Sequence, residues 1–227
     1  MDTPTPSHSV QTPLIRLEEV CFAYDPGRMV LNQCHLSLRP GERVGLVGPT
    51  GGGKTTLLHL IVGLLRPTAG RVEIFGKPRT KEADFLEVRR RVGLLFQDAD
   101  DQLFFPTVAE DVAFGPLNLG KPEEEVRRLV RETLAELGLA GYENRIIYRL
   151  SGGEKRLAAL AGVLAMQPEV LLLDEPFAGL DEKTAQRVLD ILARLPQTML
   201  LVSHHRDWLR QIATRTVRLQ DGKLREE

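Results

Sequence analysis

A glycine-rich loop constrains the fold of this chain more than any other feature of its sequence. The loop reads Gly48-Pro49-Thr50-Gly51-Gly52-Gly53-Lys54-Thr55-Thr56 and matches the pattern G-x-x-x-x-G-K-S/T. It follows a strand-like segment at 43–47 and precedes a helix-like segment at 53–65, which is the context that the pattern requires. Glycines let successive backbone N–H groups turn around phosphate oxygens, and the helix start adds partial positive charge there. The loop therefore predicts a nucleotide site in which Lys54 reaches the β- and γ-phosphates and Thr55 ligates Mg²⁺.

Two carboxylates follow a second apolar strand, at the edge where open α/β sheets bind their ligands. Positions 170–173 are apolar without interruption, which indicates a central strand covered on both sides. Asp174 and Glu175 come directly after it. Beside a phosphate loop, we expect Asp174 to hold Mg²⁺ through water and Glu175 to polarise the water that attacks the γ-phosphate.

A third motif, Leu150-Ser151-Gly152-Gly153-Glu154, precedes a helical segment at 155–166. Ser151 is predicted to cap that helix, with Glu154 as the acidic partner of a capping box. The cap does not explain two successive glycines, which are favourable at a helix start only if another group must approach the backbone closely. A helix start with free N–H groups is a phosphate site, so this segment is a second candidate for nucleotide binding.

The order of the remaining elements indicates an α/β fold. Strands alternate with helices, which implies a mostly parallel sheet covered by helices. A turn at Asp25-Pro26-Gly27 joins the first two strands. Beyond the segments already named, strands are predicted at 14–23, 30–38, 71–75, 92–95 and 199–202, and helices at 85–91, 122–137 and from residue 182 onward, with a short helix and strand at the end.

The chain of 227 residues divides into a tail and one domain with an insertion. Residues 1–13 are rich in Pro, Thr and Ser and have no signal-peptide pattern, so they are predicted to be a disordered tail. Residues 97–162 have mostly helical spacing and are predicted to be a helical subdomain inserted between core segments 14–96 and 163–227.

Composition excludes several classes of protein. The 30 Lys and Arg residues nearly balance 31 Asp and Glu residues, so no global basic field is available to hold nucleic acid. Two cysteines without C-x-x-C spacing argue against a structural zinc site. The longest apolar stretches, 57–65 and 157–166, are too short to cross a bilayer as helices. We therefore expect any work at a membrane to depend on docking to another protein.

Taken in order, these motifs resemble the ATPase subunit of an ABC transporter. The phosphate loop, LSGGE and LLLDEP are followed by Ala178-Gly179-Leu180-Asp181 and Val202-Ser203-His204, and the resemblance covers nearly all of 14–227. It implies a phosphate-loop NTPase fold with a RecA-like parallel core, antiparallel N-terminal strands and the inserted helical subdomain. It also implies a head-to-tail dimer in which each ATP lies between one subunit's phosphate loop and the other subunit's segment 151–154.

The resemblance assigns further roles by position. It implies that Tyr24 stacks on adenine, that Gln97 senses Mg²⁺ and the attacking water, and that His204 contacts the γ-phosphate. Asp181 is expected at the dimer interface. Glu154 stands where the family more often has Gln, a departure that removes neither a phosphate ligand nor a catalytic carboxylate. The implied cofactors are ATP and Mg²⁺.

The stretch 92–120 resembles the ATPases of cobalt-type and energy-coupling-factor importers most closely. Its diagnostic parts are Phe96-Gln97-Asp98, Asp101-Gln102-Leu103-Phe104 and the run Glu110-Asp111-Val112-Ala113-Phe114-Gly115-Pro116. That branch imports cobalt, nickel, biotin or other vitamins. The implied partners are a second ATPase subunit, identical or a close paralogue, a transmembrane coupling protein and a substrate-binding membrane protein, with the ATPase peripheral at the cytoplasmic face of the cell membrane.

Four large apolar residues in 97–114 could have either of two roles. Leu103, Phe104, Phe105 and Phe114 either pack inside the helical subdomain or form the groove for a helix of the transmembrane protein. For the whole chain, the alternative function is a soluble ABC-type ATPase acting on nucleic acid or ribosomes. We favour the importer, because the sequence has neither a basic face nor a long coiled-coil insertion.

Overall fold

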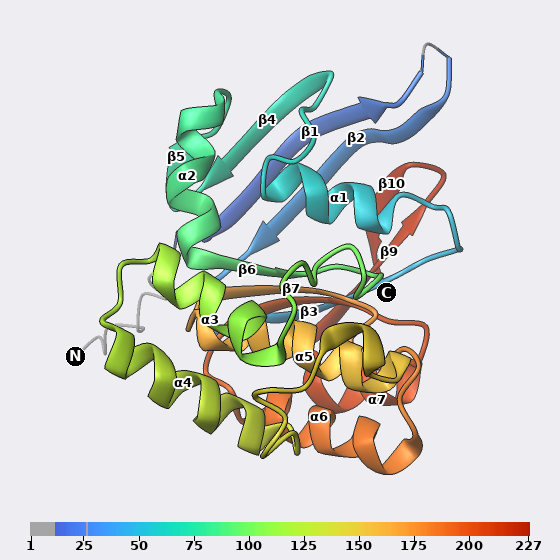
Figure 1. The fold of residues 1–227 in the computed structure, drawn as a ribbon. Coiled ribbons are helices and arrows are strands. Elements are labelled where there is room, and N and C mark those ends of the chain that lie inside the picture. The colour runs from blue at the N-terminus through green and yellow to red at the C-terminus, as the bar shows by residue number, and fades with distance from the viewer. Residues whose placement is uncertain (1–11, 26) are drawn as a thin grey trace, which may run out of the picture.

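The computed structural model describes residues 12–25 and 27–227. Residues 1–11 of the predicted tail, and Pro26 of the predicted turn, lie outside the described residues. The chain forms two sheets with helices between and below them (Figure 1). This arrangement confirms the predicted α/β fold with antiparallel N-terminal strands and a mostly parallel core.

The larger sheet carries the parallel core. Its strand order is β10-β9-β3-β8-β7-β6, in which β10 pairs antiparallel with β9 and every other pair is parallel. The strands are β3 (Arg43–Val47), β6 (Val92–Leu95), β7 (Val170–Asp174), β8 (Thr198–Val202), β9 (Arg215–Gln220) and β10 (Lys223–Glu226). All of β7 is buried, as its uninterrupted apolar run predicts.

Alternate residues of the parallel strands face two separate cores. In β7, Leu171 and Leu173 pack with the helices that follow β6 in the chain. Val170 and Leu172 pack with α1 (Lys54–Ile61) and the antiparallel sheet. Successive side chains of a strand point to opposite faces, so one strand serves both cores. The antiparallel sheet has the order β2-β1-β4-β5 and consists of β1 (Ile15–Ala23), β2 (Met29–Leu38), β4 (Ala69–Ile74) and β5 (Lys77–Pro78).

The first helix is shorter than its sequence predicts. The apolar pattern predicts a helix over 53–65, but α1 ends at Ile61 and Gly53 is its N-cap. Gly63 takes a left-handed φ of 72°, and the N–H groups of Leu64 and Leu65 both donate to the carbonyl of His59. A glycine in this conformation ends a helix, and the apolar residues beyond it belong to a turn rather than to the helix.

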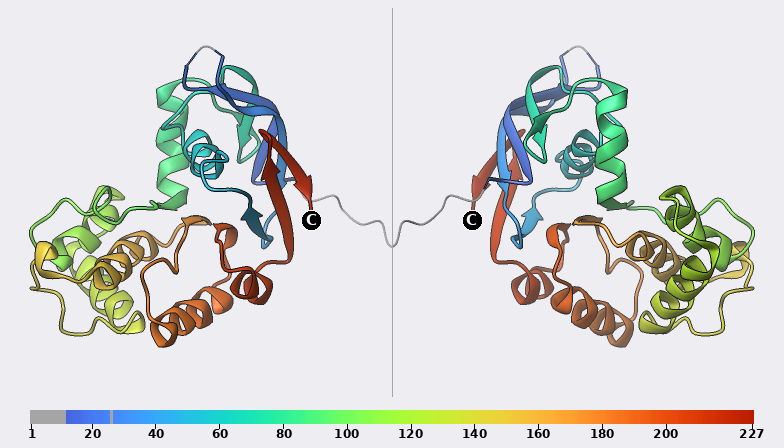
Figure 2. Two further views of the ribbon diagram at one scale, coloured as in Figure 1. Left: turned by 90° about the vertical axis from the view of Figure 1, so that its right-hand side faces the viewer. Right: turned by 90° about the vertical axis from the view of Figure 1, so that its left-hand side faces the viewer.

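The helical region between β6 and β7 holds three α-helices and one short 3-10 helix. They are α3 (Val108–Asn118), α4 (Glu123–Glu136), η1 (Ile147–Arg149) and α5 (Gly152–Ala165). Figure 2 shows α3 and α4 on the outer side of α5, away from the antiparallel sheet. Val126, Val130 and Leu134 of α4 are buried against α5, as their spacing predicts. Two further helices, α6 (Glu182–Arg194) and α7 (Arg206–Ile212), complete this core.

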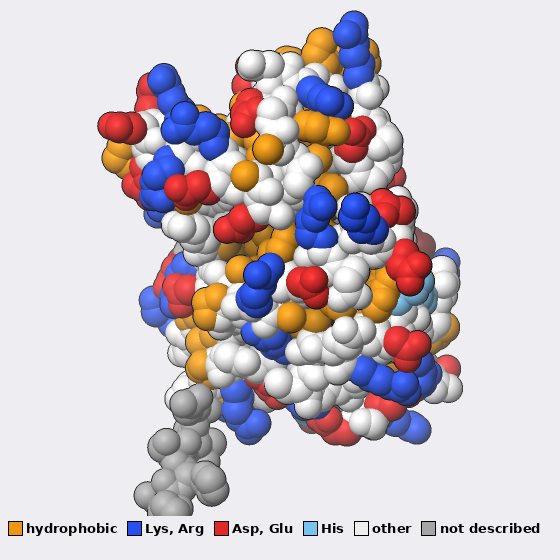
Figure 3. All heavy atoms as spheres, turned by 90° about the horizontal axis from the view of Figure 1, so that it is seen from below, with side chains coloured by type: hydrophobic (Ala, Val, Ile, Leu, Met, Phe, Trp, Pro, Cys, Tyr) orange, Lys and Arg blue, Asp and Glu red, His pale blue; other side chains and the backbone are white. Residues whose placement is uncertain are grey.

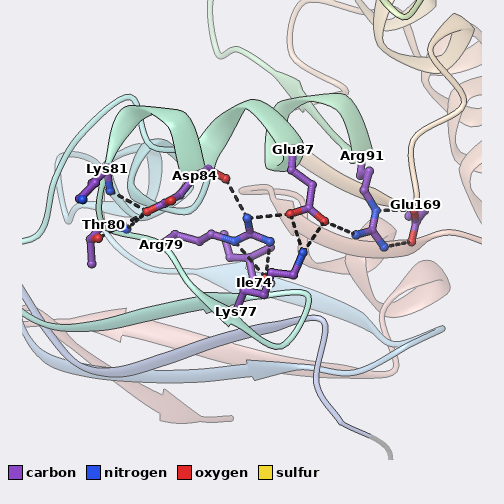
Figure 4. A network of polar contacts seen from close by, with 9 residues as sticks. All are labelled: Ile74, Lys77, Arg79, Thr80, Lys81, Asp84, Glu87, Arg91 and Glu169. Carbon is purple, nitrogen blue, oxygen red and sulfur yellow. Dashed lines mark hydrogen bonds and ion pairs between the residues drawn. The ribbon is translucent and has the colours of Figure 1, made fainter.

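A polar network fixes α2 (Glu82–Arg91) to the sheets (Figure 4). The buried guanidinium of Arg79 donates to the carbonyl of Ile74 from Nε at 3.1 Å and pairs with Glu87 at 2.9 Å. Arg91, at the end of α2, donates to Glu87 and to both carboxylate oxygens of Glu169, which precedes β7. The network therefore joins the antiparallel sheet, α2 and the parallel core into one support.

Candidate nucleotide site

Most of the predicted nucleotide residues line one cavity of about 330 Å³ at the carboxyl ends of β3, β7 and β8. Phosphate-loop residues meet the carboxylates that end β7 and the histidine that follows β8 there. The lining consists of Tyr24, Arg28, Val30, Thr50, Gly51, Gly52, Gly53, Lys54, Thr55, Thr56, Gln97, Asp174, Glu175, Val202 and His204. Gly48 and Pro49 line a neighbouring hollow, together with His204.

The loop can close only with glycine at its ends. Gly48 has a φ of 153°, and a Cβ on it would lie 2.3 Å from the carbonyl oxygen of Leu219. Gly53 has a φ of 96°, and a Cβ there would lie 2.8 Å from Val30. Lys54 Nζ donates to the carbonyls of Gly48 and Pro49 at 3.0 and 2.9 Å, so the loop holds its own lysine. Burial lowers the Lys54 pKa, with Glu175 and Asp174 opposing that shift.

Two oxygen groups meet beside the lysine. Thr55 Oγ1 donates to Asp174 Oδ2 at 2.5 Å, which places a hydroxyl from α1 against a carboxylate from β7. The hydroxyl oxygens of Tyr24 and Thr56 lie 3.0 Å apart, while 58% of Tyr24 is exposed at the cavity. Gln97 is exposed just after β6 and also lines a second hollow beside Gly152. Hydroxyl, carboxylate and amide groups therefore line one cavity.

Glu175 is held in an unusual backbone conformation with one free oxygen. Its φ is 51°, and its Oε2 accepts a hydrogen bond from the backbone N–H of His204 at 3.3 Å. Its buried Oε1 lies 3.3 Å from His204 Nε2, but no described group makes a hydrogen bond to it. Burial raises the Glu175 pKa above its ordinary value. A buried and basic carboxylate at a phosphate cavity suits the polarisation of water, and its Oε1 contacts His204 without a hydrogen bond from the described residues.

The neighbouring histidine has a different environment. His205 stacks on Trp208, with ring centroids 4.3 Å apart. His204, in contrast, lines the nucleotide cavity and contacts Glu175. Of the two histidines, only His204 lines the candidate nucleotide cavity, whereas His205 packs on Trp208.

The carboxylate of Asp174 yields a stability prediction. Burial raises its pKa above the ordinary 3.8. A carboxyl whose pKa is higher in the folded chain binds its proton more tightly there, so stability falls as the pH rises through that interval. We expect Asp174→Asn to raise the melting temperature of the nucleotide-free protein at neutral pH, by roughly 2–4 °C for each kcal/mol gained. The gain should shrink as the pH is lowered toward 3.8. An unchanged or lower melting temperature at neutral pH would contradict this reading.

The motif 151–154 lies outside this cavity, as does Asp181. Ser151 and Gly152 are exposed, and a Cβ on Gly152 would meet no atom within 4 Å. Packing inside this chain therefore does not require glycine at that position. Asp181 caps α6 through Thr184, with its Oδ1 accepting from the Thr184 N–H at 3.1 Å.

The sequence patterns missed two arginines at or beside the site. Arg28 lines the cavity from the turn between β1 and β2. Arg156 is 3% exposed, and its guanidinium donates to the carbonyls of Phe96, Asp174 and Glu175. An arginine two residues after the LSGGE motif is the only sequence signal for Arg156, because its partners are backbone groups distant in sequence.

Comparison with known families identifies the chain. A family model described as ABC transporter matches residues 31–178. The chain belongs to the ABC transporter family. It is an ABC ATPase that binds and hydrolyses ATP for membrane transport, which confirms the predicted family, fold and enzymatic activity. Among the residues that the structure describes, no helix is long and apolar enough to cross a membrane.

Individual relatives of this ABC ATPase cover most of its length. A putative ABC transporter ATP-binding protein of Nitratidesulfovibrio vulgaris is 50% identical over 212 residues, which are 92% of this chain and 77% of that protein. The energy-coupling factor transporter ATP-binding protein EcfA of Methanothermobacter thermautotrophicus is 45% identical over 215 residues, 93% of this chain and 69% of that protein.

Solved structures give the same result. The cbiO1 protein of Clostridium perfringens, part of the ABC transporter complex cbiONQ, matches with a TM-score of 0.82 and 31% identity, covering 95% of this chain and 88% of that one. A dimeric ATP-binding cassette in a post-hydrolysis state with ADP and Pi matches with a TM-score of 0.87 and 30% identity, covering 94% of this chain and 97% of that one.

Proposed function

We propose that this ABC ATPase powers import through a membrane complex of the cobalt-type or energy-coupling-factor kind. The transported solute is a transition-metal ion, cobalt or nickel, or a vitamin such as biotin. The single observation that carries the motor function is the cavity that brings Lys54, Asp174, Glu175 and His204 together. The import branch is supported by the EcfA and cbiO1 relatives. The ATPase would act at the cytoplasmic face of the cell membrane, bound peripherally to its partners.

Within the cavity we assign roles by chemistry. Backbone N–H groups of the phosphate loop and Lys54 bind the phosphates of ATP, and the exposed ring of Tyr24 stacks on adenine. Glu175 accepts a proton from the attacking water, and His204 contacts the γ-phosphate. Glu175 Oε1, which no described group engages by hydrogen bonding, is the atom available to that water.

The oxygen groups of the site fit Mg²⁺. The hydroxyl of Thr55 and the carboxylate of Asp174 already meet, and Gln97 lines the same cavity. Among the described residues, no cluster of three or more His, Cys, Asp or Glu side chains could hold a metal without other ligands. Mg²⁺ is commonly bound by one or two protein groups together with substrate phosphates, which suits this donor set. When bound, the ion neutralises charge on the β- and γ-phosphates.

The motif 151–154 serves the nucleotide of a second ATPase subunit in this proposal. The motif forms a helix start that does not line the chain's own nucleotide cavity; Ser151 and Gly152 are exposed there, and Gly153 and Glu154 are half-buried. A second subunit, identical or a close paralogue, would place its ATP against this helix start and Asp181 at the interface. The dimeric cassette with ADP and Pi is a structural relative that supports such pairing.

An apolar groove is the proposed contact for the transmembrane coupling protein. A hollow of about 240 Å³ lies between α2 and the helices α3 and α5, with Val62, Leu64, Phe104, Phe114 and Met166 in its lining. Phe104 is 70% exposed and Phe114 45% exposed, whereas Leu103 packs at the edge of the core. The groove suits the apolar face of a helix from the coupling protein. Gln97 begins the segment that leads to Phe104, so movement at the nucleotide would reach the groove through a short stretch of chain.

Removal of both exposed rings tests this assignment. We expect Phe104→Ala with Phe114→Ala to reduce co-purification with the membrane partners and uptake of solute, while ATP binding by the isolated subunit persists, because exposed apolar area contributes to docking rather than to folding. The matched control is Leu117→Ala, an exposed residue of α3 that does not line the groove. Unchanged assembly and uptake would place the docking site elsewhere. A collapse of the melting temperature would show that the rings belong to the core.

A soluble ABC-type ATPase acting on nucleic acid or ribosomes is the alternative function. Such a protein needs a concentrated basic surface. The net charge here is −1, and on the face seen in Figure 3 the Lys and Arg side chains alternate with Asp and Glu. This charge pattern favours the import function. Co-expression with the adjacent membrane-protein genes, followed by uptake assays with cobalt, nickel and biotin, tests the import branch, and the absence of any membrane complex would count against it.

A further inference from the structure

The carboxylate of Glu154 is engaged at both of its oxygens. Its Oε2 accepts hydrogen bonds from the Ser151 N–H at 2.8 Å and from the Ser151 hydroxyl at 2.9 Å. Its Oε1 accepts one from the Tyr142 hydroxyl at 2.6 Å and lies 3.5 Å from a guanidinium nitrogen of Arg145. The Arg145 guanidinium also lies over the Tyr142 ring, 3.6 Å from its centroid. One oxygen of Glu154 therefore holds the serine, and the other is held from outside the motif.

The segment that carries Tyr142 and Arg145 is anchored to another helix. Its Arg145 carbonyl accepts from the Val108 N–H at 3.1 Å, and its Glu143 carbonyl accepts from the Ala109 N–H at 2.9 Å. These two N–H groups belong to the first turn of α3, where helix donors have no partner within the helix. Tyr142 itself packs against the helical core. Its hydroxyl therefore extends from a fixed base toward the start of α5.

The contacts of Tyr142 and Arg145 with Glu154 also offset the negative charge of this carboxylate. A carboxylate beside a nucleotide phosphate repels it, whereas a glutamine in the same place does not. The hydrogen bond from Tyr142 is the main cause that lowers the Glu154 pKa, so the group is charged at neutral pH. Tyr142 and Arg145 offset this charge on the side away from Ser151. Glu154 can then orient Ser151 without presenting a free oxygen to an incoming phosphate.

We propose that Tyr142, supported by Arg145, is a positioning residue that fixes Ser151 through Glu154 for contact with the nucleotide of the second subunit. This inference rests on the proposed ATP sandwich and deepens it. Ser151 is followed by two glycines, which offer little restraint of their own. The hydrogen bond from Tyr142 supplies the restraint, since a charge-assisted bond of this kind is stronger than a neutral one.

Removal of one hydroxyl tests the proposal. Tyr142→Phe, placed in a Glu175→Gln background, keeps the ring that packs against the core and stacks under Arg145. We expect the ATP-induced dimer to weaken by about tenfold, because the side chain of Ser151 would then be ordered only on pairing, at both sites of the dimer. Affinity of the monomer for Mg-ATP should stay within about twofold, since the phosphate loop is untouched. The control is Tyr148→Phe, because Tyr148 is 73% exposed on the same subdomain.

The readouts separate three results. Three quantities are measured: dimerisation by analytical ultracentrifugation with and without Mg-ATP, monomer affinity for Mg-ATP, and melting temperature. Of the two variants, only Tyr142→Phe should lose pairing. It should do so with unchanged monomer affinity, at a temperature where its melting curve shows the chain to be folded. If the Glu175→Gln reference pairs with ATP and Tyr142→Phe pairs equally well, the positioning role is wrong although the sandwich stands. If the reference itself fails to pair, the sandwich is wrong and the proposal falls with it.

Discussion

Replacement of Glu175 by glutamine is expected to lower single-turnover ATP hydrolysis by about 10²–10⁴ while ATP binding persists. The reason lies in the geometry of one atom. Glu175 Oε1 is buried at the cavity and has no hydrogen-bond donor among the described residues, and burial raises the pKa of the group. A glutamine preserves the size and the contact with His204 but cannot take a proton from water.

The assay should use the assembled transporter, with hydrolysis followed over one turnover and ATP affinity measured separately. Glu136→Gln is the control, because Glu136 is exposed on α4 and does not line the nucleotide cavity. Wild-type turnover in Glu175→Gln would remove Glu175 from the catalytic role. Loss of ATP binding in this variant would instead assign it to binding.

Replacement of Arg156 by methionine is expected to destabilise the fold by about 3 kcal/mol or more. Arg156 donates to the carbonyls of Phe96, Asp174 and Glu175, and methionine would leave these acceptors without their donor. Each buried acceptor that loses its partner costs roughly 1–3 kcal/mol, partly offset by the removal of a buried charge. The same contacts tie α5 to the ends of β6 and β7, so ATP binding should weaken as well.

Urea unfolding monitored by circular dichroism measures this loss. Arg149→Met is the matched control, because Arg149 is exposed in the same subdomain and should change stability by less than about 0.5 kcal/mol. A loss below about 1 kcal/mol in Arg156→Met would mean that water or neighbouring groups replace the guanidinium, and the structural role assigned to it would be wrong.

Local sequence patterns predict the fold, and the structure brings most of the proposed nucleotide residues to one cavity. The phosphate loop and the fully buried strand before Asp174 depend on residues that are adjacent in sequence, so periodicity and glycine spacing reveal them. The helix predicted over 53–65 is the instructive difference. Its apolar residues continue past Ile61, and only the left-handed conformation of Gly63 ends the helix.

Contacts between distant segments could not be predicted from pattern. Arg156 donates to the backbone carbonyls of Asp174 and Glu175, and no side-chain pattern in the sequence marks these as its partners. Tyr142 donates to Glu154 from a loop without regular structure. The exposure of Phe104 likewise depends on how α3 sits against α2, a matter of packing rather than of local preference. Tertiary packing therefore supplies the residues that support the candidate site, whereas local sequence patterns reveal those that line its cavity.

Association of the Glu175→Gln chain, measured by light scattering with and without Mg-ATP, tests the central claim most directly. The motif 151–154 does not line the chain's own phosphate cavity, and in the proposed sandwich this motif completes the ATP site of a second subunit. ATP that binds the paired form better than the single chain should drive pairing by mass action. We expect the Glu175→Gln chain to be a monomer without nucleotide and a dimer with Mg-ATP. A stable dimer without nucleotide, or a monomer that remains single with Mg-ATP bound, would contradict it.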